Sequence, residues 1–381
     1  MLRATIRTAR NVICNSAALI LLVALWTPMP VSAASADIQD LKQVRKLAGQ
    51  GSIRDEIALG GDYFIGKGVP QDSKMAAYWY EKAAGLGSPE AQNQIGYFYQ
   101  AGIGVSQDSS RALHWYQLAA SSGFAKAKVN LAVAYLHGLG VQKNEDLAVQ
   151  LLTQAFQAGN GTAATYLGVL NYLGIAVKED KVAAEKFFES ASKLHDPLAA
   201  FNLGSLYSIE ENHPHDFPRA ADLLRQSADA GYVPAMHSLG LLLLNHPELA
   251  SNPGQARTLL ETAANAGFWK SSAALAIIAR DGIGVPADPK TAYFHLRLAI
   301  LQGGVPADQR LKKDIEVMST RLDREDRHQA DSSAKNWFEH HSIPLLFVFK
   351  DSTNKFFPMA AMAVAPDGSF AGQLIPLSSS E

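Results

Sequence analysis

The sequence predicts an all-α fold, a right-handed α-solenoid of seven 36-residue helix-turn-helix repeats with helical caps, because three ladders of residues share one step. The first ladder is alanine, at Ala76, Ala112, Ala148, Ala184, Ala220, Ala256 and Ala292. The second holds small residues, at Gly60, Gly96, Ala132, Gly168, Gly204, Gly240 and Ala276. The third reads Gly87, Gly123, Gly159, His195, Gly231, Gly267 and Gly303. A strict period over 252 of 381 residues favours one repeat array over two or three globular domains.

Each repeat reads as two helices. In the second unit, Ala91, Ile95 and Tyr99 share one face of a first helix, and Gly102 ends it because glycine tolerates a positive φ. Every second helix is preceded by Asp or Asn, whose side chain can cap the first turn. These predicted N-caps are Asp72, Asp108, Asn144, Asp180, Asp216, Asn252 and Asp288. Ala112, Trp115, Ala119 and Ala120 are expected to form the inward face of the second helix, with the large ring filling the gap between paired helices.

Residues 1–36 are predicted to be a signal peptide. Arg3, Arg7 and Arg10 precede an apolar run over 12–26 that is short for a membrane span. Small residues then lead to a cleavage site near Ala36. We therefore expect a periplasmic or secreted protein after Sec-type cleavage, with no membrane span in the mature chain; an uncleaved anchor is the alternative. The only cysteine, Cys14, leaves with this segment.

The ends of the array are expected to be atypical, because a terminal repeat must close the core. Residues 37–51 predict an N-terminal capping helix, and 52–303 the seven repeats. Residues 304–341 predict a C-terminal capping helix pair, with Leu311, Ile315, Met318 and Leu322 as one apolar stripe. The tail, 342–381, carries a turn signal at 365–368 and is compatible with a short hairpin or with disorder.

The units resemble a known family. The pattern Ala-x-x-x-Leu-Gly-x-x-Tyr-x-x-Gly-x-Gly-Val, a loop Asp, then Ala-x-x-Trp-x-x-x-Ala-Ala-x-x-Gly is fullest over 57–87 and 91–123. It resembles the Sel-one-like repeat (SLR), a relative of the tetratricopeptide repeat (TPR). The resemblance implies a fold in which first helices line a concave surface. It also implies a non-catalytic adaptor, which holds a sensor kinase's outer domain, assists envelope assembly or contacts a host.

A partner-binding groove is expected on the first helices, opposite their packing stripe. At 100° per residue, apolar side chains gather on this far side. The set comprises Val129, Val133, Leu136, Val169, Tyr172, Phe201, Leu241 and Leu244. One interpretation is an exposed groove that holds a segment of a protein partner. The other is that the curvature of the array buries these residues between neighbouring first helices.

Units five and six lack the loop glycines of the other repeats. In their place stand His213, His215, His246 and Glu210, which would lie along one edge if the units stack in register. Imidazole and carboxylate groups can hold a divalent metal. The alternative is two solvated loops without a ligand. No cofactor is otherwise expected.

The remaining features argue against other classes of function. A net charge of -2 gives no long-range attraction to nucleic acid. The aromatic groups at 78–80 and 114–116 fall at packing positions rather than on a carbohydrate platform. No catalytic constellation stands out, so the protein is not expected to be an enzyme. β-Lactam binding or hydrolysis, linked to a cysteine-rich branch of the resembling family, would need cysteine pairs that the mature chain lacks. The expected function is an exported interaction scaffold; a secreted host-interaction factor is the alternative.

Overall fold

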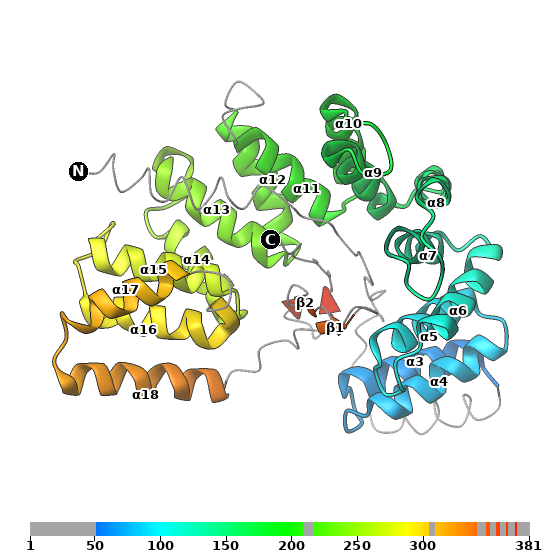
Figure 1. Cartoon of the computed structure of the whole chain (residues 1–381), viewed down its shortest axis with the longest axis horizontal. Coiled ribbons are helices and arrows are strands. Elements are labelled where there is room, and N and C mark those ends of the chain that lie inside the picture. The colour runs from blue at the N-terminus through cyan, green and yellow to red at the C-terminus, as the bar shows by residue number, and fades with distance from the viewer. Residues whose placement is uncertain are drawn as a thin grey trace. The chain divides into compact units, whose positions relative to one another are not determined.

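The computed structural model describes residues 51–208, 216–304 and 309–340, and four short strands between 348 and 371. The predicted signal peptide and residues 37–50 of the predicted N-terminal capping helix lie outside the described residues. The described helices divide at Ala199 and Ala200 into two compact units, which we call the N-terminal unit and the C-terminal unit. Each unit is described by itself (Figure 1).

The N-terminal unit contains four helix pairs in which every helix packs against the next one in the sequence (Figure 1). The pairs are α3 (Ile53–Ile65) with α4 (Ser73–Gly85), α5 (Pro89–Ala101) with α6 (Ser109–Ser121), α7 (Ala125–His137) with α8 (Glu145–Gln157), and α9 (Gly161–Leu173) with α10 (Lys181–Lys193). The start of α11 (Pro197–Ser208) ends this unit.

The C-terminal unit continues the same pairing. It holds α12 (Phe217–Asp229), then α13 (Val233–Asn245), η1 (Pro247–Leu249) and α14 (Gln255–Asn265), then α15 (Trp269–Asp281), α16 (Pro289–Ala299) and the π-helical turn η2 (Ile300–Gly304). Two capping helices follow, α17 (Gln309–Ser319) and α18 (Arg324–His340), and both pack on α16. The prediction of an all-α repeat solenoid is therefore confirmed, and a helical cap is seen at its C-terminal end.

The helix ends follow the chemistry expected from the sequence. Five first helices, α3, α5, α7, α9 and α15, end at glycines with left-handed φ, such as Gly102 at 70° and Gly138 at 69°, whereas α13 ends at His246 with φ of -132°. Six of the seven predicted N-caps accept a hydrogen bond from a backbone N–H of the following helix, as Asp108 does from Ser110 and Arg111. The seventh prediction was wrong, because α14 begins two residues later and Asn252 caps the N–H of Gly254 in the preceding turn.

The aromatic ring that fills the space between α5 and α6 belongs to Tyr116, whereas the sequence predicted Trp115 for this place. Tyr116 is only 1% exposed and lies against Gly96 of α5, whereas Trp115 is half-buried at the side of the core. A Cβ on Gly96 would come within 2.8 Å of the Tyr116 ring. The small-residue ladder thus makes room for the large side chain of the second helix, which is why both recur at the same step.

Adjacent repeats also pack closely through the loops at Gly104 and Gly140. Gly104, after α5, has φ 66°, and a Cβ there would lie 2.0 Å from the carbonyl oxygen of Ser73, where α4 begins. Gly140 has the same relation to Ser109 at the start of α6, at 2.6 Å. Each loop therefore rests on the second helix of the preceding repeat.

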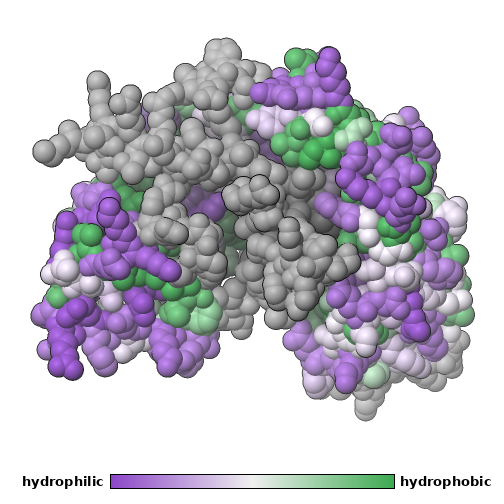
Figure 2. All heavy atoms as spheres, in the orientation of Figure 1, coloured by the Kyte–Doolittle hydropathy of each residue, from purple (hydrophilic) through white to green (hydrophobic). Residues whose placement is uncertain are grey.

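The C-terminal capping helices close the core with the predicted apolar stripe. Leu311 and Met318 are buried in a cluster with Tyr293 and Leu296 of α16, and Ile315 and Leu322 pack against it. The exposed surface of this region is mainly hydrophilic in the view of Figure 2, as the charged sequence of α18 requires.

The tail contains two short antiparallel strand pairs. Strand β1 (Val348–Lys350) pairs with β2 (Phe356–Pro358), and β3 (Ala363–Val364) pairs with β4 (Phe370–Ala371). The predicted turn at 365–368 falls between β3 and β4. No helix within the described ranges is long and apolar enough to span a membrane.

Candidate functional site

The first-helix face of the N-terminal unit is buried. On α5, every residue from Ala91 to Gln100 is buried, including positions that face away from α6. Val129, Val133 and Leu136 on α7 and Val169 on α9 are likewise buried. Burial raises the pKa of the Tyr97 phenol on the same face. This face is therefore shielded from solvent, although it includes polar side chains such as Asn93 and Asn130.

Some polar side chains on the buried face form hydrogen bonds there. The amide nitrogen of Asn130 on α7 donates to the side-chain oxygen of Asn93 on α5, at 2.8 Å. Thr165 on α9 donates to the carbonyl of Gly161 one turn earlier. A buried amide without a partner would cost about 1–3 kcal/mol, so the Asn93–Asn130 bond joins successive first helices and fixes their alignment.

The C-terminal unit repeats this arrangement with aromatic and imidazole groups. Phe201 on α11 packs edge-on against Tyr232, with ring centroids 5.1 Å apart. On α13, Nδ1 of His237 lies 3.0 Å from the hydroxyl oxygen of Ser271 on α15. Burial, and secondarily Lys270, lowers the pKa of His237 to about 3, so its ring is neutral at physiological pH.

The predicted groove residues differ in exposure. Five are buried: Val129, Val133, Leu136, Val169 and Phe201. Three are half-buried and reach the surface: Tyr172, Leu241 and Leu244. Leu241 and Leu244 also pack against a cluster that contains Leu260. The first five are therefore not exposed, while the binding role of the set stays a prediction.

The predicted metal site can be described at only one residue. His213, His215 and Glu210 lie outside the described residues. His246 stacks on Phe217, with ring centroids 3.9 Å apart, and its Nδ1 lies 3.2 Å from a carboxylate oxygen of Glu248. Within the described parts of the chain, no group of three or more His, Cys, Asp or Glu side chains is placed to hold a metal.

The two aromatic clusters contribute mainly to packing. Tyr80 and Tyr116 are buried core residues, and Trp79 packs against the small cluster of Leu59 and Val69. Tyr78, by contrast, is 54% exposed. A single exposed ring does not make a carbohydrate platform, so packing is the function that the geometry supports for these positions.

The comparison with protein families matches the repeats unit by unit. The Sel1 repeat model matches residues 56–88, 89–124, 125–160, 161–196, 197–232, 233–268 and 270–304. The chain belongs to the Sel1 repeat family. Proteins of this family typically act as protein-interaction scaffolds, and the fold is generally non-catalytic.

Several solved structures are similar to this chain. A Sel1 repeat protein from Oxalobacter formigenes is 26% identical to the chain described here, with a TM-score of 0.51. The match covers 60% of the present chain and 100% of the Oxalobacter chain. A protective antigen of uropathogenic Escherichia coli strains, which displays an SLR fold, is 23% identical over 80% of this chain and 72% of its own, with a TM-score of 0.41. An immunity protein from Pseudomonas aeruginosa is 18% identical over 82% and 94%, with a TM-score of 0.36. No curated protein matches the chain.

Sequence reasoning missed several polar contacts of the Sel1 repeats. Asn93 and His237 occupy the same register position as Val129, but their partners Asn130 and Ser271 come from other register positions. A polar residue at a position that is otherwise apolar was the available signal. The identity of each partner depends on how adjacent first helices are aligned, which the period alone does not give.

Proposed function

We propose that this Sel1 repeat protein is an exported, non-catalytic scaffold that binds a protein of the cell envelope through its first-helix face. The partner class is the outer domain of a sensor kinase or an envelope assembly protein. The observation that carries the proposal is the seven-repeat array, whose first helices hold apolar side chains at positions that do not pack on their own second helices.

The accessible first-helix residues of each unit, taken separately, are the expected contacts. Tyr172 lies near the end of α9, half-buried, with the ammonium of Lys181 5.7 Å from its ring centroid. Leu241 and Leu244 lie one turn apart on α13 and are half-buried. Aromatic and branched apolar residues of this kind supply most of the binding energy in protein interfaces when a partner covers them.

Site-specific photocrosslinking in living cells tests the contact. A photoreactive phenylalanine at Tyr172 is expected to capture an envelope protein. The same group at Val182, which is 63% exposed on α10 of the same repeat, is the matched control and should not capture it. Equal capture at both positions, or capture at Val182 alone, would contradict the assignment of the face.

Substitutions then test the energetics with the captured partner in purified form. Tyr172→Glu and Leu241→Glu are each expected to weaken binding at least about tenfold, because a charge must be desolvated in the interface. Val182→Glu should leave the affinity unchanged. Circular dichroism melting of each variant separates loss of binding from loss of fold.

Export is tested independently by cell fractionation. The full chain is expected in the periplasmic fraction without residues 1–36, and a chain lacking 2–36 should stay in the cytoplasm. Recovery in the culture medium would favour the host-interaction role instead. Retention of the complete N-terminus in the membrane fraction would contradict cleavage.

A further inference from the structure

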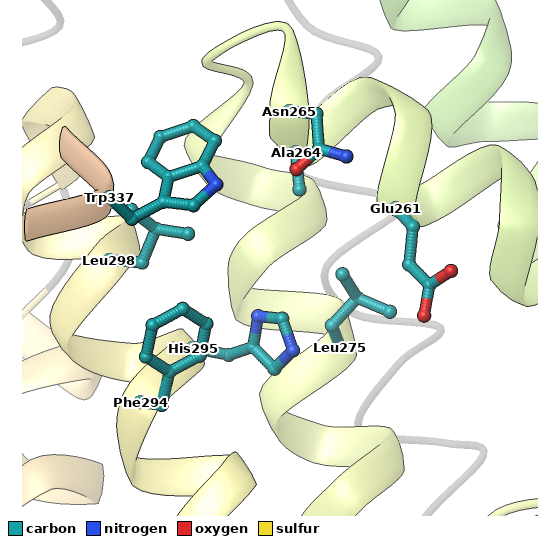
Figure 3. A pocket seen from close by; sticks show the side chains of 8 residues that line it. All are labelled: Glu261, Ala264, Asn265, Leu275, Phe294, His295, Leu298 and Trp337. Atoms are coloured by element: carbon teal, nitrogen blue, oxygen red, sulfur yellow. The ribbon is translucent and has the colours of Figure 1, made fainter. Parts of the chain in front are cut away.

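A cavity of about 210 Å³ lies within the C-terminal unit, between the last repeats and the cap. Its walls come from α14, α15, α16 and α18, and its principal side chains are Glu261, Leu275, Phe294, His295, Leu298 and Trp337 (Figure 3). It shares no residue with the predicted groove, although Leu241 and Leu244 pack against the cluster that contains its lining residues Ala264 and Leu275.

His295 breaks the repeat pattern at this cavity. The same register position of the second helix holds a large apolar residue in all six preceding repeats: Trp79, Trp115, Leu151, Phe187, Leu223 and Leu259. Only the seventh repeat places an imidazole there. The substitution is unfavourable for packing alone, because an aliphatic or aromatic side chain would fill the space without a polar group to satisfy.

The neighbouring positions change in the opposite sense. Phe294 stands where the other repeats have Tyr78, His114, Gln150, Lys186, Asp222 and Thr258. Leu298 stands where most of them have a polar or charged residue. The seventh repeat is thus polar where its relatives are apolar, and apolar where they are polar. Together with Trp337 of the cap, these changes produce a mainly apolar, half-open pocket around one imidazole.

The imidazole has an unsatisfied atom in this pocket. Nδ1 of His295 is buried and has no hydrogen-bond partner among the described residues. Burial lowers the pKa of His295 to about 4, so the ring is neutral near pH 7. Figure 3 shows the imidazole extending from α16 toward Leu275, with the rings of Phe294 and Trp337 on its other side.

Water is a poor occupant of the apolar side of this pocket, whose other side is open to solvent and lined by the polar residues Glu261 and Asn265. A buried water molecule needs about two to four polar partners, whereas Leu275, Phe294 and Leu298 present apolar walls. A cavity of about 150 Å³ is enough for a benzene molecule when its walls are apolar. The volume therefore suits one aromatic ring with a small polar group.

The charges at the cavity favour a neutral ligand. Glu261 contributes the only acidic side chain of the lining, and its carboxylate accepts from Nε of Arg257 at 2.7 Å. The opposite charges of this pair offset each other, which leaves no uncompensated charge to attract an ion. Aromatic walls offer stacking, and His295 offers one hydrogen bond.

We propose that this cavity binds a small neutral aromatic ring with one hydrogen-bonding group, of the phenol or indole class. The ring would stack against Phe294 and Trp337, and its OH or NH group would bond to Nδ1 of His295. Such a group can come from a free small molecule or from a Tyr or Trp side chain of a partner protein. The site goes beyond the proposed scaffold function, because it uses the cap rather than the first-helix face.

Saturation-transfer NMR and calorimetry with the mature chain test the site. Indole and phenol are expected to bind saturably with a Kd of about 0.1–1 mM, the range open to ligands of about seven to nine heavy atoms. His295→Leu introduces the leucine that the two preceding repeats have at the equivalent position, Leu223 and Leu259. This substitution should weaken indole binding at least about tenfold. Its melting temperature should equal or exceed that of the parent, which excludes unfolding as the cause.

The control is His328→Leu, which removes an exposed histidine from α18 and should leave binding unchanged. Absence of saturable indole and phenol binding to the parent chain would overturn the proposal. So would equal binding by His295→Leu.

A second arm assigns the source of the ring. N-acetyl-tryptophanamide and N-acetyl-tyrosinamide carry the backbone that a partner's side chain would bring. Binding of these amides as tight as that of indole and phenol supports a side chain of a partner protein. Binding of only the free compounds supports a small molecule.

Discussion

His195 is the only member of the third ladder that is not glycine, and it keeps the glycine conformation. Its φ is 59°, while Gly159 and Gly231 at equivalent positions have φ of 82° and 85°. A left-handed conformation costs an L-residue about 1–2 kcal/mol. We expect His195→Gly to raise the free energy of unfolding by about 0.5–1 kcal/mol, since the greater entropy of unfolded glycine offsets part of the gain. Urea denaturation measures the difference.

The control for His195 lies at the end of α8. Ala158 has φ of -82°, so Ala158→Gly relieves no strain and should lower stability. Loss of stability in both variants would show that the left-handed backbone at His195 is not a net cost.

The buried His237 is expected to make the folded chain less stable as the pH falls below about 6.5. Its pKa is about 3 in the folded chain and about 6.5 when unfolded, so the unfolded state binds the proton more strongly. The stability associated with the neutral ring is complete above about pH 6.5 and is lost as the pH falls toward 3, at about 1.4 kcal/mol per pH unit. His237→Gln should reduce the slope of stability against pH between pH 6 and 4 by about 1.4 kcal/mol per pH unit in urea titrations, while His295, whose pKa is about 4, continues to contribute.

The exposed His328 provides the comparison for this measurement. His328→Gln should leave the pH slope of the parent unchanged. If His237→Gln left the slope of stability against pH unchanged, the His237 ring would have to be protonated in the folded chain while it contacts Ser271.

At the scale of helix pairs, the contact between Gly96 and Tyr116 sets the separation of α5 and α6. Aromatic second-helix residues face glycine in this chain, as Tyr116 and Phe188 do, whereas Ala132 and Ala276 lie 20 residues before Leu152 and Leu296. Gly96→Ala is expected to cost about 1–3 kcal/mol through overpacking. Adding Tyr116→Leu should recover part of this loss, with a coupling of at least about 1 kcal/mol in a double-mutant cycle.

Gly85, the last residue of α4, is the matched control for this pair. A Cβ there meets nothing within 4 Å, so Gly85→Ala should stabilise the chain slightly. Additive effects of the two substitutions at Gly96 and Tyr116 would contradict direct packing between them.

Most helix boundaries could be predicted because they depend on local chemistry. Glycine at Gly102 and aspartate at Asp108 act through backbone groups within a few residues, which a sequence displays directly. The N-cap prediction at Asn252 was wrong because the preceding loop lacks the glycines of the other repeats and contains the extra turn η1, which shifts the start of α14. The prediction that Trp115 fills the space between α5 and α6 was wrong by one residue. Successive side chains on a helix differ by 100° in direction, so Tyr116 lies in this space and Trp115 at its edge.

On the scale of the whole chain, the period predicted the fold, while the candidate sites needed three-dimensional information. The exposure of Val129 or Val169 depends on neighbouring elements rather than on its own helix. The cavity at His295 needs α18, which carries none of the ladders. Its only sequence signal was the exchange of polar and apolar residues at Phe294 and His295 relative to the other six repeats.

The loop contacts of Gly104 and Gly140 constrain how the length of this protein can change. Each glycine meets the helix start that lies 31 residues before it, in the preceding repeat. Duplication or loss of one complete 36-residue block would recreate the same junctions, whereas a one-residue insertion would move a side chain into a space that admits none. At these two junctions, inherited changes in length are therefore expected as whole 36-residue blocks rather than as single-residue changes in loop length.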